Sequence, residues 1–169
     1  MSADARIRVD KFFRSEKTLE GFGHWYQSER TGLYKFQRQI AEDGVSHGFK
    51  LEINAYVDTN PREFRFMVNG LDACICRLDC APTTDPTHIN GPNRPFGFPY
   101  AVEGHHFHPW MENRVFSTAS ALHKKLPYAL ESNGRISTIE QGFWHFCGLV
   151  GISGTNDDEP DWPKPGRFL

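Results

Sequence analysis

Histidines are concentrated in one short stretch of this 169-residue chain, close to an arginine and an aspartate. Four of the eight histidines fall between His88 and His108. Histidine exchanges protons near neutral pH, and its neutral ring is the commonest metal ligand among side chains. The stretch therefore predicts proton transfer, phosphate binding or metal binding. The candidate catalytic residues are Arg77, Asp79, His88, His106 and His108.

Two strands are expected to position these side chains, one over residues 71–80 and a shorter one over residues 104–110. Residues two apart on a strand lie on the same face. The arginine and the aspartate of the set therefore share a face of the first strand. The last two histidines share a face of the second, with His105 turned away. If the strands are neighbours, these four side chains converge, and a proline-rich loop over residues 81–99 delivers His88.

Such a group could cleave an RNA phosphodiester without a metal ion, so no cofactor is favoured. One histidine would take the proton of the 2′-hydroxyl group, and another would protonate the leaving oxygen. Arg77 would stabilise the charge on the phosphate, and Asp79 would orient an imidazole or hold the arginine.

A divalent metal ion is the alternative cofactor. It would be bound by His106, His108 and Glu112, a set that His88 or Asp79 could complete. The spacing of the first three residues resembles part of the first cupin motif. A tyrosine stands where that motif has its glycine, and no second cupin motif follows.

The fold class is predicted to be α+β, with an antiparallel β-meander of about four to six strands packed against two C-terminal helices. Alternating apolar residues over 49–57 and 64–68 predict two strands, and the Asn-Gly pair at 69–70 predicts a type I′ turn into the third. Capping residues and apolar spacing predict helices over 117–126 and 137–150.

A single domain is expected over residues 1–152. Residues 1–20 are expected to be a loose lead-in or a short helix, and the acidic, proline-rich tail over 153–169 is expected to be disordered. The cysteines of the 71–80 strand are expected to form an apolar stripe facing the core rather than a zinc or disulfide set. They are Cys74, Cys76 and Cys80.

Composition limits the classes of function. With 14% aromatic and 24% charged residues, the chain is expected to be a packed globular protein. Nineteen basic and twenty-one acidic residues leave a net charge of -2, so binding to nucleic acid would need a local basic patch. The sequence contains no signal peptide and no apolar run of roughly 18 residues, which predicts a cytoplasmic protein with no membrane partner.

Three short strings resemble a group of small bacterial domains and are similar to the TumE-type toxins of toxin–antitoxin pairs. They are Arg77-Leu78-Asp79, His88-Ile89-Asn90 and His106-Phe107-His108, within residues 49–130. Cys80 stands where the toxin pattern has asparagine, and the loop to the second string is longer. The resemblance implies a toxin that acts on RNA or a nucleotide as a ribonuclease and is neutralised by an antitoxin protein.

A non-catalytic protein is the alternative. In that interpretation the chain is a small α+β module that docks onto a bacterial or phage protein, and its histidines hydrogen-bond loops together. The near-neutral charge and the acidic tail favour this alternative, because a protein partner requires no basic surface. The compact group of polar residues favours the enzyme.

Overall fold

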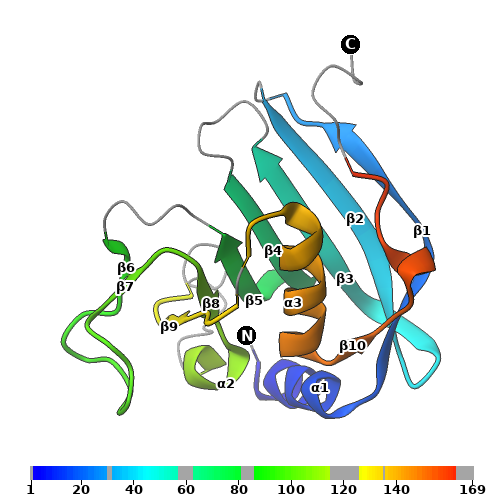
Figure 1. Ribbon diagram of the computed structural model, residues 1–169. Helices are drawn as coiled ribbons and strands as arrows, with labels where there is room; N and C mark the ends of the chain where they lie inside the picture. Colours follow the sequence, from blue (N-terminus) through cyan, green and yellow to red (C-terminus); the bar gives the residue numbers. More distant parts are fainter. Residues whose placement is uncertain are drawn as a thin grey trace.

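The structure is a computed structural model that describes most of the chain (Figure 1). The described residues are 2–29, 32–56, 63–80, 86–114, 126–134 and 136–162. None of the helices in these stretches combines the length and the apolar character needed to cross a bilayer.

The main sheet contains eight strands, and a separate sheet contains two. The main-sheet strands are β1 (Lys17–Gln27), β2 (Leu33–Glu42), β3 (Val45–Tyr56), β4 (Glu63–Gly70), β5 (Ala73–Cys80), β8 (His106–His108), β9 (Leu130–Glu131) and β10 (Ile152–Ser153). Their order is β10-β1-β2-β3-β4-β5-β8-β9. Only β1 and β10 pair in parallel among these neighbours. The strands β6 (Pro86–Ile89) and β7 (Ala101–Glu103) form the small sheet.

The predicted α+β class is confirmed, but the predicted number of four to six strands is wrong. The meander from β1 to β5 is extended at its two sides by β10 and by β8 and β9. Each of these added strands has only two or three residues. The strand predicted over residues 104–110 contains β8, whereas alternation cannot be recognised over the two residues of β9 or of β10, so sequence periodicity could not reveal these two strands.

Two long helices cover one face of the main sheet (Figure 1). They are α1 (Ala3–Arg14) and α3 (Ile139–Val150). Phe12 of α1 and Phe143 of α3 are fully buried in the same core as Ile53 and Leu78 of the sheet. The helix α3 confirms the prediction for 137–150, whereas the helix predicted over 117–126 lies outside the described residues.

Both ends of the described chain are packed against the sheet. The lead-in is the helix α1, and buried Lys17 donates hydrogen bonds to the carbonyls of Phe12 and Ser15 at its end. Residues 153–162 of the expected disordered tail also pack, because the ring of Trp162 contacts Phe143. Glu159 accepts hydrogen bonds from two tryptophans of this region.

The turn between β4 and β5 lies two residues later than predicted. Leu71 and Asp72 have φ angles of 53° and 61°, as both central residues of a type I′ turn require. The Asn-Gly pair belongs instead to β4. A Cβ atom on Gly70 would lie 2.2 Å from the ring of Phe49, so the glycine allows that ring to pack against the strand.

A bulge in β5 changes the expected cysteine stripe. The register shifts between Val68 and Asn69, opposite Cys74 and Cys76. Cys76 and Cys80 face the core as expected, but Cys74 is half-buried and lies outside the core. All four cysteines are free thiols.

Gly142 and Gly148 of α3 offer a matched test of how this helix packs. A Cβ on Gly142 would lie 2.7 Å from the ring of Phe66, whereas a Cβ on Gly148 would meet nothing within 4 Å. We expect Gly148→Ala to raise the free energy of unfolding by up to about 1 kcal/mol, because alanine favours helix. We expect Gly142→Ala to lower it by about 1–3 kcal/mol through overpacking. Urea denaturation followed by tryptophan fluorescence measures both, and equal effects would contradict the packing of α3 on β4.

Candidate functional site

Pairing of β5 with β8 builds the centre of the candidate site. Arg77 lies opposite His108, and Asp79 lies opposite His106. Leu78 lies between Arg77 and Asp79 on β5, and its side chain points into the core on the other face of the sheet. The predicted convergence of these four side chains is therefore confirmed.

The carboxylate of Asp79 connects the polar side chains of the candidate site. It accepts hydrogen bonds from Nε of Arg65 at 2.5 Å and from Nε of Arg77 at 2.8 Å. Its Oδ2 atom also lies 3.3 Å from Nε2 of both His106 and His108. Burial alone would raise the pKa of Asp79, but the two histidines and then the two guanidinium charges outweigh burial and hold the pKa well below its usual range. Asp79 is therefore an anion in the folded protein.

His108 is a neutral, completely buried ring. Burial lowers its pKa to about 4, although hydrogen bonding to Asp79 opposes the shift. Its Nε2 atom also lies 3.0 Å from Nη2 of Arg77. Nε2 can donate to the carboxylate or accept from the guanidinium, and in either tautomer the buried Nδ1 has no hydrogen-bond partner among the described residues.

His106 differs from His108 because both of its ring nitrogens face acceptors. Nδ1 lies 2.8 Å from the carbonyl oxygen of Gly104, and Nε2 faces Asp79. A ring with a proton on each nitrogen satisfies both contacts. His105 points away, as expected, toward Ile136 and His145.

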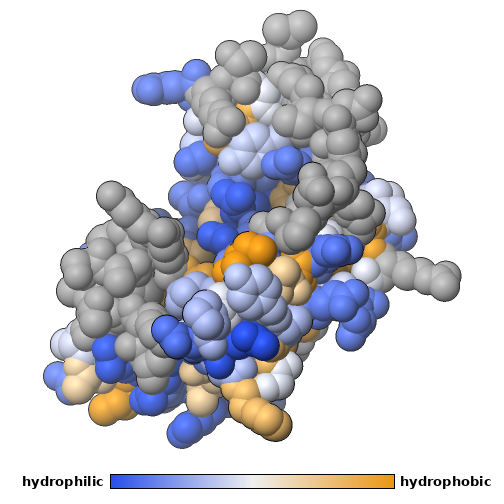
Figure 2. Space-filling view, turned by 90° about the vertical axis from the view of Figure 1, so that its left-hand side faces the viewer, coloured by the Kyte–Doolittle hydropathy of each residue, from blue (hydrophilic) through white to orange (hydrophobic). Residues whose placement is uncertain are grey.

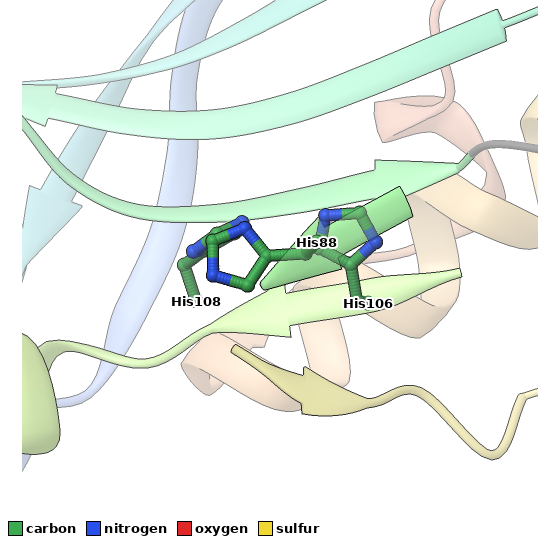
Figure 3. A group of neighbouring side chains, drawn as sticks. All are labelled: His88, His106 and His108. Atoms are coloured by element: carbon green, nitrogen blue, oxygen red, sulfur yellow. The ribbon is translucent and has the colours of Figure 1, made fainter. Parts of the chain in front are cut away.

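His88 reaches the group as expected, but it does so from the strand β6 and not from a loop, because residues 86–89 pair with β7. Its ring centre lies 5.5 Å from that of His106 and 4.7 Å from that of His108 (Figure 3). Its Nε2–H donates to the carbonyl of Pro127 at 3.0 Å, which leaves the lone pair of the neutral ring on Nδ1. Burial lowers the pKa of His88, and the positive charge of Arg77 acts in the same direction, while the bond to Pro127 opposes them.

Two asparagines that the sequence analysis left without a role hold the carbonyl that orients His88. Asn90 donates to the carbonyls of Pro99 and Ala129 and accepts from the backbone N–H of Ala129. Asn113, in the short helix α2 (Trp110–Asn113), makes the same pair of bonds with the backbone of Tyr128. Both side chains are buried, so they fix the segment that contains Pro127.

Arg65 was also missed by the sequence analysis. It lies on β4 directly opposite Asp79, so its position follows from the register of the hairpin. The predicted turn at 69–70 would have given the wrong register. The true turn at Leu71 and Asp72, together with the register shift between Val68 and Asn69, brings the two side chains together.

The three histidines form a cluster that could hold a metal ion. Each of His88, His106 and His108 offers one nitrogen, and these atoms lie within 4.8 Å of one another. Glu112, expected as the third ligand, is not part of this cluster, because it follows Pro109 into α2. Zinc–nitrogen bonds of about 2.0–2.1 Å in a tetrahedral site require ligand nitrogens about 3.3 Å apart, so the rings would have to close around an ion.

Comparison with known proteins found no family model, no curated protein and no solved structure that matches this chain significantly.

The burial of His108 predicts a specific dependence of stability on pH. Between pH 6.5 and about 4 the unfolded chain binds a proton at this ring and the folded chain does not. Acid therefore favours unfolding in that window, and we expect the free energy of unfolding to fall by roughly 3 kcal/mol as the pH drops through it. Asp79 adds to the loss only below its ordinary pKa of 3.8, because its pKa in the folded protein is lower still.

Denaturation of the parent and of His108→Asn at several pH values measures this effect. Asparagine keeps a polar group but does not titrate, so the variant should lose most of the pH dependence in this window. His88, whose pKa is also lowered, contributes equally to both proteins. Parallel curves for the two proteins would contradict a neutral buried ring at position 108.

Proposed function

We propose that the protein is a ribonuclease that cleaves RNA phosphodiesters by proton transfer through histidines, without a metal ion. The charge of the site is the observation that best supports the proposal. Two guanidinium groups, those of Arg65 and Arg77, pair with the single carboxylate of Asp79. Two positive charges against one negative leave an excess of positive charge beside the histidine rings. A phosphodiester gains negative charge in its transition state and is suited to that environment.

His88 is the proposed general base. Its lone pair lies on Nδ1, and its lowered pKa keeps the ring unprotonated near neutral pH. It is also half-buried, whereas His106 and His108 are almost completely covered. In the proposed reaction Nδ1 takes the proton of the 2′-hydroxyl, and the 2′ oxygen attacks phosphorus as the bond to the 5′ oxygen breaks.

His106 is the proposed general acid. Its contacts with Gly104 and Asp79 accommodate a ring with two protons, so it can give one to the departing 5′ oxygen. Its ring stacks near that of His88, with centres 5.5 Å apart, so both rings can act on one phosphate. The products would be a 2′,3′-cyclic phosphate and a free 5′-hydroxyl group.

The two arginines are proposed to bind the phosphate oxygens. Their side chains are 37% and 24% exposed, in contrast with the buried histidines. Each uses Nε to bind Asp79, and the terminal nitrogens of Arg65, which bond to none of the described residues, are proposed to bind the substrate. Asp79 and His108 then act as positioning residues that fix the arginines and His106.

Substitution of His88 tests the proposal directly. We expect the purified protein to cleave single-stranded RNA, and we expect His88→Ala to lower the rate by at least about 100-fold, as loss of a general base does. Mass spectrometry of the products would detect the cyclic phosphate. His47→Ala is the matched control, because His47 is exposed on β3.

Three results would overturn the ribonuclease proposal: RNA left intact by the parent, cleavage of an all-deoxy strand, or equal rates for the parent and His88→Ala. In bacteria, the ribonuclease would act as a cytoplasmic toxin that needs a protein inhibitor. Growth arrest on induction of the parent but not of His88→Ala is the cellular readout.

The docking module is less well supported than the enzyme. On the side of the molecule that carries the β6–β7 hairpin, hydrophilic residues dominate the described surface, and apolar residues form small separate patches (Figure 2). Protein-binding surfaces are typically marked by larger contiguous apolar patches.

A divalent metal centre is the second candidate, and the orphaned Nδ1 of His108 supports it. A buried nitrogen that has no partner in the described part of the chain is a suitable ligand atom, and the lone pair on Nδ1 of His88 is a second one. The guanidinium of Arg77, 3.0 Å from the other nitrogen of His108, disfavours a second cation in the same place.

Chelation separates the two candidates. We expect cleavage of RNA to be unchanged by an excess of EDTA, and we expect the purified protein to contain less than one divalent metal ion per ten chains. Loss of activity in EDTA that added zinc or manganese restores would instead assign a metal centre to the three histidines.

A further inference from the structure

A polar cavity of about 410 Å³ lies on the open face of the main sheet, beside the β4–β5 hairpin. Its polar lining comes from three neighbouring strands and from the bulged start of β5. The polar side chains are those of Gln37, Lys50, Glu52, Asn69, Asp72 and Cys74. This volume falls within the range of small-molecule sites.

The carboxylate of Glu52 is held in a fixed position in this cavity. Its Oε2 atom accepts hydrogen bonds from Nε2 of Gln37 at 2.9 Å and from Nδ2 of Asn69 at 3.1 Å. Each amide nitrogen spends one hydrogen on Glu52 and keeps a second as a donor, each amide keeps its carbonyl oxygen as an acceptor, and Glu52 keeps Oε1. The cavity therefore presents several acceptors, among them the carboxylates of Glu52 and Asp72, together with two amide donors and the cation of Lys50.

The cavity and the histidine site lie on the same face of the sheet. Glu52 pairs with Met67, Met67 pairs with Arg77, and Arg77 pairs with His108. Residues that pair directly share a face, and two strand spacings of about 4.8 Å separate Glu52 from Arg77 by about 10 Å. That distance is comparable to the size of one nucleotide. A base in the cavity can therefore belong to an RNA chain whose phosphate lies at Arg65 and Arg77.

We propose that this cavity binds a guanine base of the RNA substrate, an inference that rests on the proposed ribonuclease function. The Watson–Crick edge of guanine carries two adjacent donors, N1–H and the N2 amino group, next to the O6 acceptor. The donors match the oxygens of Glu52 and its amide partners. The ammonium group of Lys50 matches O6.

The other bases fit this lining less well. Adenine places an acceptor at N1, where guanine has a donor, so that atom would face the oxygens of Glu52. Uracil places acceptors on both sides of its single ring N–H. Cytosine offers one amino donor beside two acceptors. Only guanine among the four has two neighbouring donors on this edge, so we expect cleavage next to guanine.

Nucleotide binding tests the inference without requiring cleavage. We expect guanosine 5′-monophosphate to bind at least about tenfold more tightly than adenosine or inosine 5′-monophosphate, because inosine lacks the N2 amino group. Chemical-shift changes in an NMR titration would give the affinities and locate the site at β3, β4 and the start of β5. In Glu52→Gln the preference for guanine over adenine should fall to about one.

Glu20→Gln is the matched control, because Glu20 is an exposed glutamate on β1 outside the cavity. Urea denaturation would show that Glu52→Gln folds, and Lys50→Met offers a second change in the same cavity. Equal affinities for the nucleotides, or an unchanged preference in both folded variants, would overturn the guanine site. RNA cleavage without a preference for guanine would overturn this inference alone, whereas guanine-selective binding without cleavage would overturn the ribonuclease function alone.

Discussion

The site depends on the contacts that the buried carboxylate of Asp79 makes with two arginines and two histidines. The strand β8 has only three residues, and two of them, His106 and His108, face this one side chain. A slip of one residue would turn both histidines toward the core, because successive residues of a strand point to opposite faces. The contacts with Asp79 therefore favour a single register for a strand too short to be fixed by its backbone hydrogen bonds alone. They also bring the two arginines to the same place.

The alternation of residues was sufficient to predict which side chains face one another at the centre of the site. Arg77 and Asp79 were assigned to one face because their neighbours Cys76 and Leu78 are apolar, and both of these residues lie in the core. The same rule could not give Arg65, because its position opposite Asp79 depends on the hairpin register. The Asn-Gly pair favoured a turn, but packing of Phe49 against Gly70 placed the glycine in the strand instead.

Other parts of the fold depend on contacts between residues far apart in the sequence. Asn113 lies 15 residues before Tyr128, and nothing in its local sequence distinguishes a capping asparagine from one that binds a distant backbone. The pairing of β1 with β10 joins residues more than 130 positions apart, such as Lys17 and Ile152. Local periodicity carries no information about such pairs, which is why the sheet is wider than predicted.

The polar network is difficult to explain as a means of stabilising the fold. Replacing a buried ionic group by well-packed apolar residues is often neutral or stabilising, since desolvation of the charges offsets their attraction. Here one carboxylate, two guanidinium groups and two buried histidines gather on one face of β4, β5 and β8, and the Nδ1 atom of His108 has no protein partner among the described residues. A purely structural network would be expected to satisfy that nitrogen. Strongly shifted pKa values beside accessible arginines are more typical of a functional site. A ligand that completes the network would account for the unsatisfied nitrogen of His108.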